Sequence, residues 1–249
     1  MKAESFSYAD AEAARAYISY VESPDGQAER QLLGQAIFSN LPEEKNISIL
    51  DAACGTGWLT DLLKKENINA IGCDASPRLL NYARQKYPDC TFIEADITEN
   101  PKDKLPITPF DLIVLSLASH DIENLSKAYG RLSQILKPGG SLIITTANPY
   151  YSFPVGRWKR GMLGRLLAKQ PSLRLSPYNF FIKTQRKFFW KKNIPSFFHT
   201  LPETINEALQ NGFDLKKIEE LARKNNSSSG RARQMHLYPM IFLFVFKKR

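Results

Sequence analysis

The sequence has few cysteines and no long apolar run. Its three cysteines, Cys54, Cys73 and Cys90, show no CxxC spacing and have no His-rich segment as a partner. We therefore expect no disulfide framework, no metal site and a reducing, cytoplasmic environment. The longest apolar run, residues 240–246, is far shorter than the roughly 18 residues that a membrane-spanning helix needs. The first residues have no apolar stretch of the signal-peptide kind, which also favours the cytoplasm.

Acidic residues are absent from one fifty-residue stretch. Residues 150–200 hold 11 Lys and Arg and no Asp or Glu, whereas residues 1–149 hold 14 basic and 20 acidic residues. The net charge of +9 therefore comes from a single basic segment, which is also rich in Phe, Tyr and Trp. Such an asymmetry indicates an anionic partner.

What the chain does contain is a regular alternation of short apolar runs and helical patterns. Strands separated by helices of this length predict a parallel sheet with right-handed crossovers. Ser76 is expected to cap the helix that Pro77 opens. The turn LKPGG should precede the fifth strand. The strands expected in this half are 47–51, 70–74, 91–95, 110–116 and 141–147.

The alternation of apolar runs and helical patterns stops after residue 149 and resumes near residue 201. We expect one domain over 1–249, with N-terminal helices in 1–44, a cofactor-binding half in 45–149, a basic aromatic cap in 150–200, and a C-terminal helix with strands in 201–249. The cap is interpreted as an insertion after the fifth strand.

A glycine-rich turn follows the first strand in the sequence ILDAACGTG. Glycines there allow a backbone to approach a nucleotide closely. The dinucleotide pattern GxGxxG requires a third glycine where this chain has Thr60, and the Gly-Lys-Ser/Thr of a P-loop is missing.

Carboxylates follow the next two strands. Asp74 comes 23 residues after Asp51, where a carboxylate can accept both hydroxyls of a ribose. Asp96 is followed by apolar Ile97, a pair that suits the amino edge and the face of an adenine. Asp96 could instead serve only as a helix cap.

Together, DAACGTG, GCDAS, EADI, FDLIVLSLASHD and LKPGG resemble the class I S-adenosylmethionine-dependent methyltransferases, in particular the small-molecule, ubiquinone-biosynthesis-like branch. The resemblance covers residues 45–150 well and the C-terminal part more loosely. It implies an α/β fold with a Rossmann-like, seven-stranded, mostly parallel sheet, a final antiparallel strand and helices on both faces. Ala52-Ala53 departs from the usual Leu/Val-Gly of the family, although a small residue is kept.

The resemblance also assigns residues to the cofactor, S-adenosyl-L-methionine. Its methionine end would be held by Asp51, Ala53, Gly55 and Gly57. Asp74 and Ala75 would contact the ribose, and Asp96 and Ile97 the adenine. Leu117 would line the site near the sulfonium, and Tyr20 would close over the methionine moiety.

A proton acceptor is sought among the histidines, because His titrates near neutral pH. His120 follows the fourth strand, at the edge where ligands of open α/β sheets collect, and Asp121 could orient it. A packing or capping role for His120 is the alternative. The candidate substrate contacts are Tyr8, Tyr17, Tyr151, Trp158 and His199, although Tyr8 and Tyr17 could equally be the apolar stripe of a surface helix.

The basic cap suits three kinds of partner: a small anionic or apolar molecule, an anionic membrane surface, or RNA. It could also be a solvated face over its own aromatic core. The family resemblance favours methyl transfer to O or N of a small, anionic or lipid-like molecule, with nucleic acid less favoured and no obligate protein partner. An RNA methyltransferase and a non-catalytic binding protein are the alternatives.

Overall fold

The computed structural model describes residues 8, 10–44, 46–100, 104–105, 109–150, 156–159, 172–175, 182–187, 193–222 and 239–249. For 156–159, 172–175, 182–187 and 193–196 the description covers the backbone only. Tyr151 lies outside the described residues, as does the side chain of Trp158, so neither predicted substrate contact has a described position.

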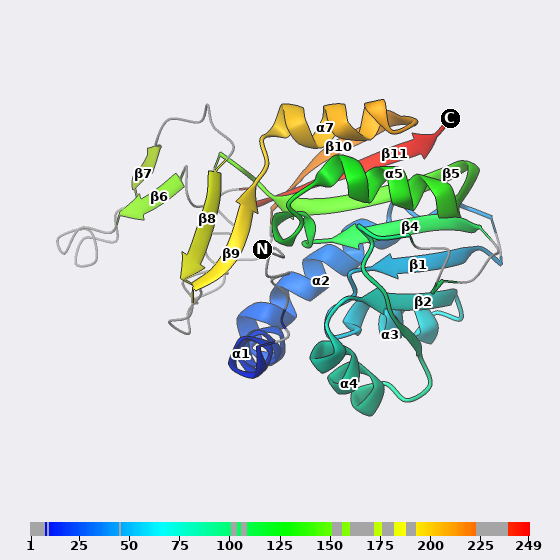
Figure 1. The fold of residues 1–249 in the computed structure, drawn as a ribbon, viewed down its shortest axis with the longest axis horizontal. Coiled ribbons are helices and arrows are strands. Elements are labelled where there is room, and N and C mark those ends of the chain that lie inside the picture. Colours follow the sequence, from blue (N-terminus) through cyan, green and yellow to red (C-terminus); the bar gives the residue numbers. More distant parts are fainter. Residues whose placement is uncertain are drawn as a thin grey trace.

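A seven-stranded sheet forms the centre of the molecule, in the order β10-β11-β5-β4-β1-β2-β3 (Figure 1). Strands β5, β4, β1, β2 and β3 run parallel, and β11 is antiparallel to both of its neighbours, β5 and β10. The predicted fold class is confirmed. The strands are β1 (Ser48–Ala52), β2 (Asn69–Asp74), β3 (Thr91–Glu94), β4 (Phe110–Ser116), β5 (Leu136–Ala147), β10 (Phe213–Leu221) and β11 (Ile241–Lys248).

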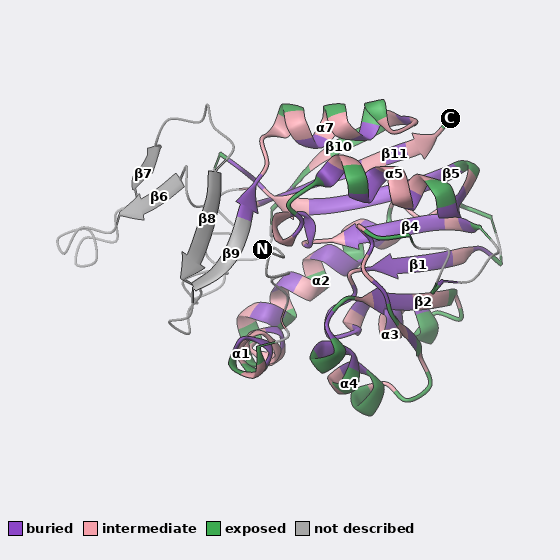
Figure 2. Cartoon of the chain, viewed as in Figure 1, coloured by how far each residue is buried: buried purple, intermediate pink, exposed green. Residues whose placement is uncertain are grey.

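Helices cover both faces of the sheet, because the buried strands present apolar side chains alternately to each side. Helices α5 (Leu125–Ile135) and α7 (Leu201–Gln210) share one hydrophobic cluster with β4, β5 and β11. Helices α2 (Pro24–Phe38) and α3 (Trp58–Lys65) share a second cluster on the opposite face. Figure 2 shows the central strands largely buried between these layers.

Two further helices lie at the β2–β3 side of the molecule. Helix α4 (Pro77–Lys86) packs on β2 and β3, and Ser76 caps it as predicted, because Leu79 N donates to Ser76 Oγ at 3.3 Å. Helix α1 (Ala11–Glu22) contacts α2 and α4. Both α1 and α2 lie within residues 1–44.

Two small hairpins follow β5 in the chain. Strand β6 (Gly156–Lys159) pairs with β7 (Ser172–Leu175), and β8 (Ile182–Lys187) pairs with β9 (Asn193–Phe198). Figure 1 shows β8 and β9 on the side toward which β1 points. Strand β9 contacts η2 (Ser119–Asp121), the 3-10 helix that follows β4. The segment expected to be a cap therefore includes strands beside the carboxyl edge of the sheet.

One local prediction is wrong. The LKPGG turn is not separate from the fifth strand, because β5 already begins at Leu136, which pairs with Phe110. The pairing register then shifts, so that Ser141 pairs with Leu112. Gly139 has φ 70° in this stretch, which shows that the turn is absorbed as an irregularity of the strand.

Candidate functional site

The carboxyl end of β1 carries a buried carboxylate. Asp51 is 2% exposed, and its Oδ2 accepts hydrogen bonds from Thr60 N at 3.1 Å and Thr60 Oγ1 at 2.7 Å. Burial raises the pKa of Asp51 to about 7, against the lowering effect of the two Thr60 bonds, and nearby Asp74 raises it further. Asp51 is therefore a carboxyl group that a positively charged ligand would ionise.

Left-handed backbone shapes the loop that follows β1. Ala53 has φ 54°, Gly55 φ 55° and Gly57 φ 76°. A Cβ at Gly57 would lie 2.6 Å from the ring of Phe92, so glycine is required there by packing as well as by conformation. Ala53 adopts the same left-handed conformation although it has a Cβ, which costs roughly 1–2 kcal/mol of backbone strain. Strain of this kind in a non-glycine residue is characteristic of functional sites.

Asp74 joins this loop to the end of β2. Its Oδ2 accepts a hydrogen bond from Gly55 N and its Oδ1 one from Ser76 N, both at 2.8 Å. Its partly buried position raises its pKa, which the two amide bonds counteract. Ala75, the next residue, is exposed. Asp74 is thus held rigidly by backbone amides beside the glycine loop.

Asp96 lies two residues past β3, the strand that pairs with β2 at Asp74. Its Oδ1 accepts hydrogen bonds from Thr98 N and Thr98 Oγ1, both at 2.8 Å, so the group it caps is a turn and not a helix. Ile97 is buried in the cluster that contains α5. Contact of Asp96 and Ile97 with an adenine stays a prediction. We call Asp51, Asp74 and Asp96 the carboxylate end.

The neighbouring strands β4 and β5 end in hydroxyl side chains instead of carboxylates. Ser116 Oγ lies 3.1 Å from Thr145 Oγ1, and Ser119 Oγ lies 2.6 Å from Thr146 Oγ1. We call these four residues the hydroxyl end. Leu117 lies between them with φ 51°, and its N donates to Thr145 O at 2.9 Å. A left-handed leucine is a backbone outlier, so β4 also ends in a strained residue at the crevice.

His120 lies in η2 at the hydroxyl end. Its Nε2 is 3.5 Å from Asp121 Oδ2, and its side chain is 15% exposed. The expected pairing of His120 with Asp121 is present. The base role itself stays a prediction.

Helix α1 covers the glycine loop with tyrosines. A Cβ at Gly55 would lie 3.3 Å from Tyr17 Cε1, and the rings of Tyr17 and Tyr8 have centroids 4.9 Å apart. Burial, followed by the charges of Asp121 and Asp74, raises the pKa of the Tyr17 phenol. Tyr20 lies on the same helix and acts electrostatically on Tyr17. Tyr17 therefore packs over Gly55, within electrostatic range of Asp74 and Asp121. The sequence alone left open whether Tyr17 lies at the site or belongs to the apolar stripe of a surface helix.

His199 is buried and joins two segments of the chain. Its Nε2 lies 2.8 Å from Ile122 O and its Nδ1 lies 3.0 Å from Glu203 Oε1, and its side chain is only 4% exposed. Glu203 also belongs to the capping box with Thr200 that begins α7. Both ring nitrogens of His199 therefore link Ile122, which follows η2, to α7, and contact of His199 with substrate stays a prediction.

Two threonines were missed as site residues. Thr60 is fully buried and holds Asp51 through two bonds. The sequence does place a hydroxyl residue in the first turn of the helix after the loop, nine residues after Asp51, and this pattern could have identified Thr60. Thr56 is 1% exposed, and its Oγ1 has no hydrogen-bond partner within the described part of the chain.

These features fit the cofactor that the sequence resemblance implied. The unpartnered Thr56 hydroxyl is a buried group that a bound ligand can satisfy. The carboxylates at the ends of the parallel strands suit a ligand that carries a sulfonium and an ammonium. No cluster of metal-binding side chains occurs among the described residues.

Residues 43–193 match a family model described as a methyltransferase domain. The chain belongs to this family, the class I S-adenosylmethionine-dependent methyltransferases, and its cofactor is S-adenosylmethionine. An S-adenosylmethionine-dependent methyltransferase from Mesorhizobium loti has a similar structure, with a TM-score of 0.72 and 25% identity, over 89% of this chain and 100% of the other.

Two curated relatives match part of the chain. The malonyl-[acyl-carrier protein] O-methyltransferase of Pectobacterium atrosepticum is 29% identical over 45% of this chain and 44% of its own length. A ubiquinone/menaquinone biosynthesis C-methyltransferase of Campylobacter jejuni is 32% identical over 41% of this chain and 45% of its own length. The chain thus spans less than half the length of these two relatives.

Among the described residues, no helix is both long enough and apolar enough to cross a membrane. All three cysteines are free thiols.

Proposed function

We propose that this methyltransferase transfers the methyl group of S-adenosylmethionine to an oxygen or nitrogen of a small, anionic or lipid-like molecule. The observation that carries the proposal is that carboxylates and neutral hydroxyl groups lie side by side at one edge of the sheet. The carboxylate end lies beside a neutral hydroxyl end that carries a histidine. The two curated relatives are named as a malonyl-[acyl-carrier protein] O-methyltransferase and a ubiquinone/menaquinone biosynthesis C-methyltransferase. Both names point to a small acceptor group, at oxygen in the first relative and at carbon in the second.

The cofactor supplies an electrophilic methyl group on a sulfonium. The chain's contribution is alignment, because an in-line displacement depends strongly on the position of nucleophile, methyl carbon and leaving group. Asp74, fixed by the amides of Gly55 and Ser76, would hold the ribose, and Asp51 would face the positive charge. Leu117 would set the wall next to the methyl group, held by its bond to Thr145.

His120 is proposed as the general base. Its Nδ1 would take the proton that the acceptor O–H or N–H loses as the new bond to carbon forms, while Nε2, which lies 3.5 Å from Asp121 Oδ2, would let Asp121 stabilise the resulting imidazolium. Burial of Tyr17 above the loop would exclude water from the reacting atoms.

The first test uses the purified protein, S-adenosylmethionine with a labelled methyl group, and an extract of source cells. The products are separated into aqueous small molecules, organic-soluble lipids and macromolecules. Label in either of the first two fractions supports the proposal and directs the search for the acceptor. Label confined to RNA or protein contradicts the substrate class, and binding of cofactor without any labelled product favours a non-catalytic role.

A His120→Gln variant tests the base. Loss of a general base lowers kcat by about 100-fold or more, while the calorimetric affinity for S-adenosylhomocysteine stays unchanged. An equal kcat in the variant and the parent would leave His120 with only a packing role.

A further inference from the structure

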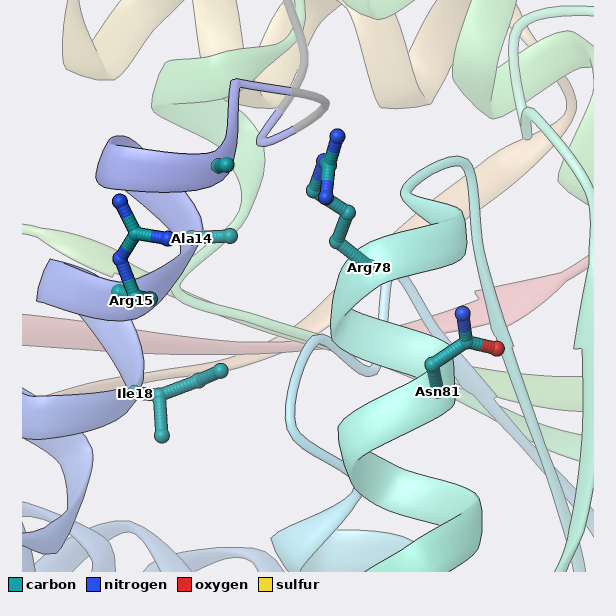
Figure 3. A pocket seen from close by; sticks show the side chains of 6 residues that line it. Ala14, Arg15, Ile18, Arg78 and Asn81 are labelled. Carbon is teal, nitrogen blue, oxygen red and sulfur yellow. The ribbon is translucent and has the colours of Figure 1, made fainter.

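A cleft separates helices α1 and α4 outside the cofactor site. The two helices run in the same direction, because Ser76 Oγ, at the start of α4, donates to Tyr8 O at 3.0 Å, and Lys86 Nζ, at the end of α4, lies 2.6 Å from Glu22 Oε1. Between these two attachments the helices leave a space of about 230 Å³ (Figure 3). Its lining residues are Ala11, Ala14, Arg15, Ile18, Arg78 and Asn81.

The lining is basic at its rim and apolar at its wall. Arg15 comes from α1 and Arg78 from α4, on opposite sides of the cleft, and none of the described residues that line it is acidic (Figure 3). Arg15 makes no hydrogen bond or ion pair within the described part of the chain and is exposed. Asn81 adds an amide, while Ala14 and Ile18 add apolar surface.

Helix polarity adds to the positive charge of this cleft. Both helices begin at the Tyr8–Ser76 end, so the positive ends of their dipoles lie together there. The carboxylate of Asp10, next to Ala11 in the sequence, accepts bonds from Glu12 N and Ala13 N at the start of α1 and offsets part of this positive charge. Neither Asp10 nor Glu12 is among the described residues that line the cleft.

The size of the cleft limits what it can hold. Pockets that enclose a drug-sized ligand measure roughly 300–1,000 Å³, so this smaller space suits a compact ligand with a short apolar part. Guanidinium groups form strong paired hydrogen bonds with phosphate and carboxylate. We infer that the α1–α4 cleft is a second ligand site, which binds a small amphiphilic anion through Arg15 and Arg78 and rests its apolar part on Ala14 and Ile18.

Occupation of the cleft would act on the cofactor site through α1. The helix that carries Arg15 also carries Tyr17, whose ring covers Gly55. A ligand that bridges α1 and α4 stabilises the position in which Tyr17 covers the loop. Cofactor and anion therefore favour the same arrangement of α1, and each raises the affinity of the other.

Hexyl phosphate is a suitable probe for the full-length protein, because inorganic phosphate has the same headgroup without the chain. Calorimetry should show hexyl phosphate binding more tightly than phosphate. Arg15→Glu should weaken hexyl phosphate binding at least about tenfold, since a charge-assisted bond is replaced by repulsion. Lys127→Glu is the matched control, because Lys127 is exposed on α5 and the change of charge is the same.

The coupling is measured as the affinity for S-adenosylhomocysteine with and without saturating hexyl phosphate. We expect an increase of about fivefold in the parent and in Lys127→Glu, and none in Arg15→Glu. Arg78→Gln, read by the same two titrations, guards against a folding defect specific to one variant. Equal hexyl phosphate binding in Arg15→Glu and Lys127→Glu overturns the site, and equal affinity for phosphate and hexyl phosphate overturns its amphiphilic character. An unchanged affinity for S-adenosylhomocysteine overturns the coupling.

Discussion

The carboxylate end and the hydroxyl end occupy one edge of one sheet but are built differently. At the carboxylate end, Asp51 and Asp74 are held by amides and by Thr60, beside the loop that contains Gly55 and Gly57. At the hydroxyl end, neutral Ser–Thr pairs link β4 to β5, and the ionisable groups are His120 and Asp121 in η2. The first arrangement suits a cationic cofactor. In the second, the side chains at the strand ends that would face the acceptor are uncharged.

Both ends place a strained residue where the strand stops. Ala53 and Leu117 have nearly the same left-handed φ, 54° and 51°. Ala53 substitutes for a glycine in a loop that a ligand must approach, whereas Leu117 keeps a partly buried side chain that packs with the α2–α3 cluster. The comparison indicates that backbone shape matters at the carboxylate end and that side-chain shape matters at the hydroxyl end.

The largest test removes a carboxylate. Asp74→Ala should lower the affinity for S-adenosylhomocysteine by at least about 100-fold, because two charge-assisted contacts to the ribose are lost. Isothermal titration calorimetry measures this loss. Glu94→Ala is the matched control, since Glu94 pairs with Asp74 in the neighbouring strand and is exposed. Asp74→Asn keeps an acceptor for Gly55 N, so it shows whether the effect comes from a changed loop conformation. An affinity in Asp74→Ala equal to that of the parent would refute the ribose assignment.

Glycine at position 57 can be compared with glycine at position 139. Both are left-handed, but a Cβ at Gly57 meets Phe92 at 2.6 Å, whereas a Cβ at Gly139 meets nothing within 4 Å. Gly57→Ala should lower the free energy of unfolding by about 2–4 kcal/mol and Gly139→Ala by about 1 kcal/mol, the difference being the clash. Urea unfolding of the two variants measures it, and equal losses would mean that Phe92 moves aside at no cost.

The pKa of Asp51 gives the carboxylate end a pH dependence that the hydroxyl pairs lack. Because its pKa rises from 3.8 to about 7 on folding, its contribution to stability is present below pH 4 and is lost as the pH rises through 7. Ionised Asp51 attracts the cofactor's positive charge, so the affinity for S-adenosylmethionine should rise about tenfold from pH 5.5 to 7. Calorimetry in that window checks the rise, and Asp51→Asn should flatten it. A rise that persists in the variant would assign the effect to another group.

The smallest test exchanges the two strained residues for glycine. Ala53→Gly should raise the free energy of unfolding by about 0.5 kcal/mol, because relief of left-handed strain exceeds the added entropy of the unfolded chain. Leu117→Gly should lower it by about 1 kcal/mol, since the lost apolar contacts outweigh the same relief. Thermal unfolding compares the variants, and changes of the same sign would show that the two strained positions are equivalent.

Much of this architecture was predictable from periodicity and from turn residues. Strand β4 is a continuous apolar run because it is buried on both faces, and Ser76-Pro77 opens α4 as its residue types require. The glycines and carboxylates were found because they recur at strand ends. Sequence did not predict the left-handed φ of Ala53 and Leu117, since neither residue favours it and the surrounding structure imposes it. The bonds of His199 to Ile122 and Glu203 were missed because they join segments up to 77 residues apart.

Strand β11 lies between β5 and β10, although it follows both in the chain. During synthesis, β10 therefore leaves the ribosome before the strand that must separate it from β5. At about 5–20 residues per second, the 27 residues from the end of β10 to the end of β11 take on the order of one to five seconds to appear. For that interval the apolar edge of β5 is open, and Lys216 and Lys217 on β10 discourage a premature pairing between the two strands.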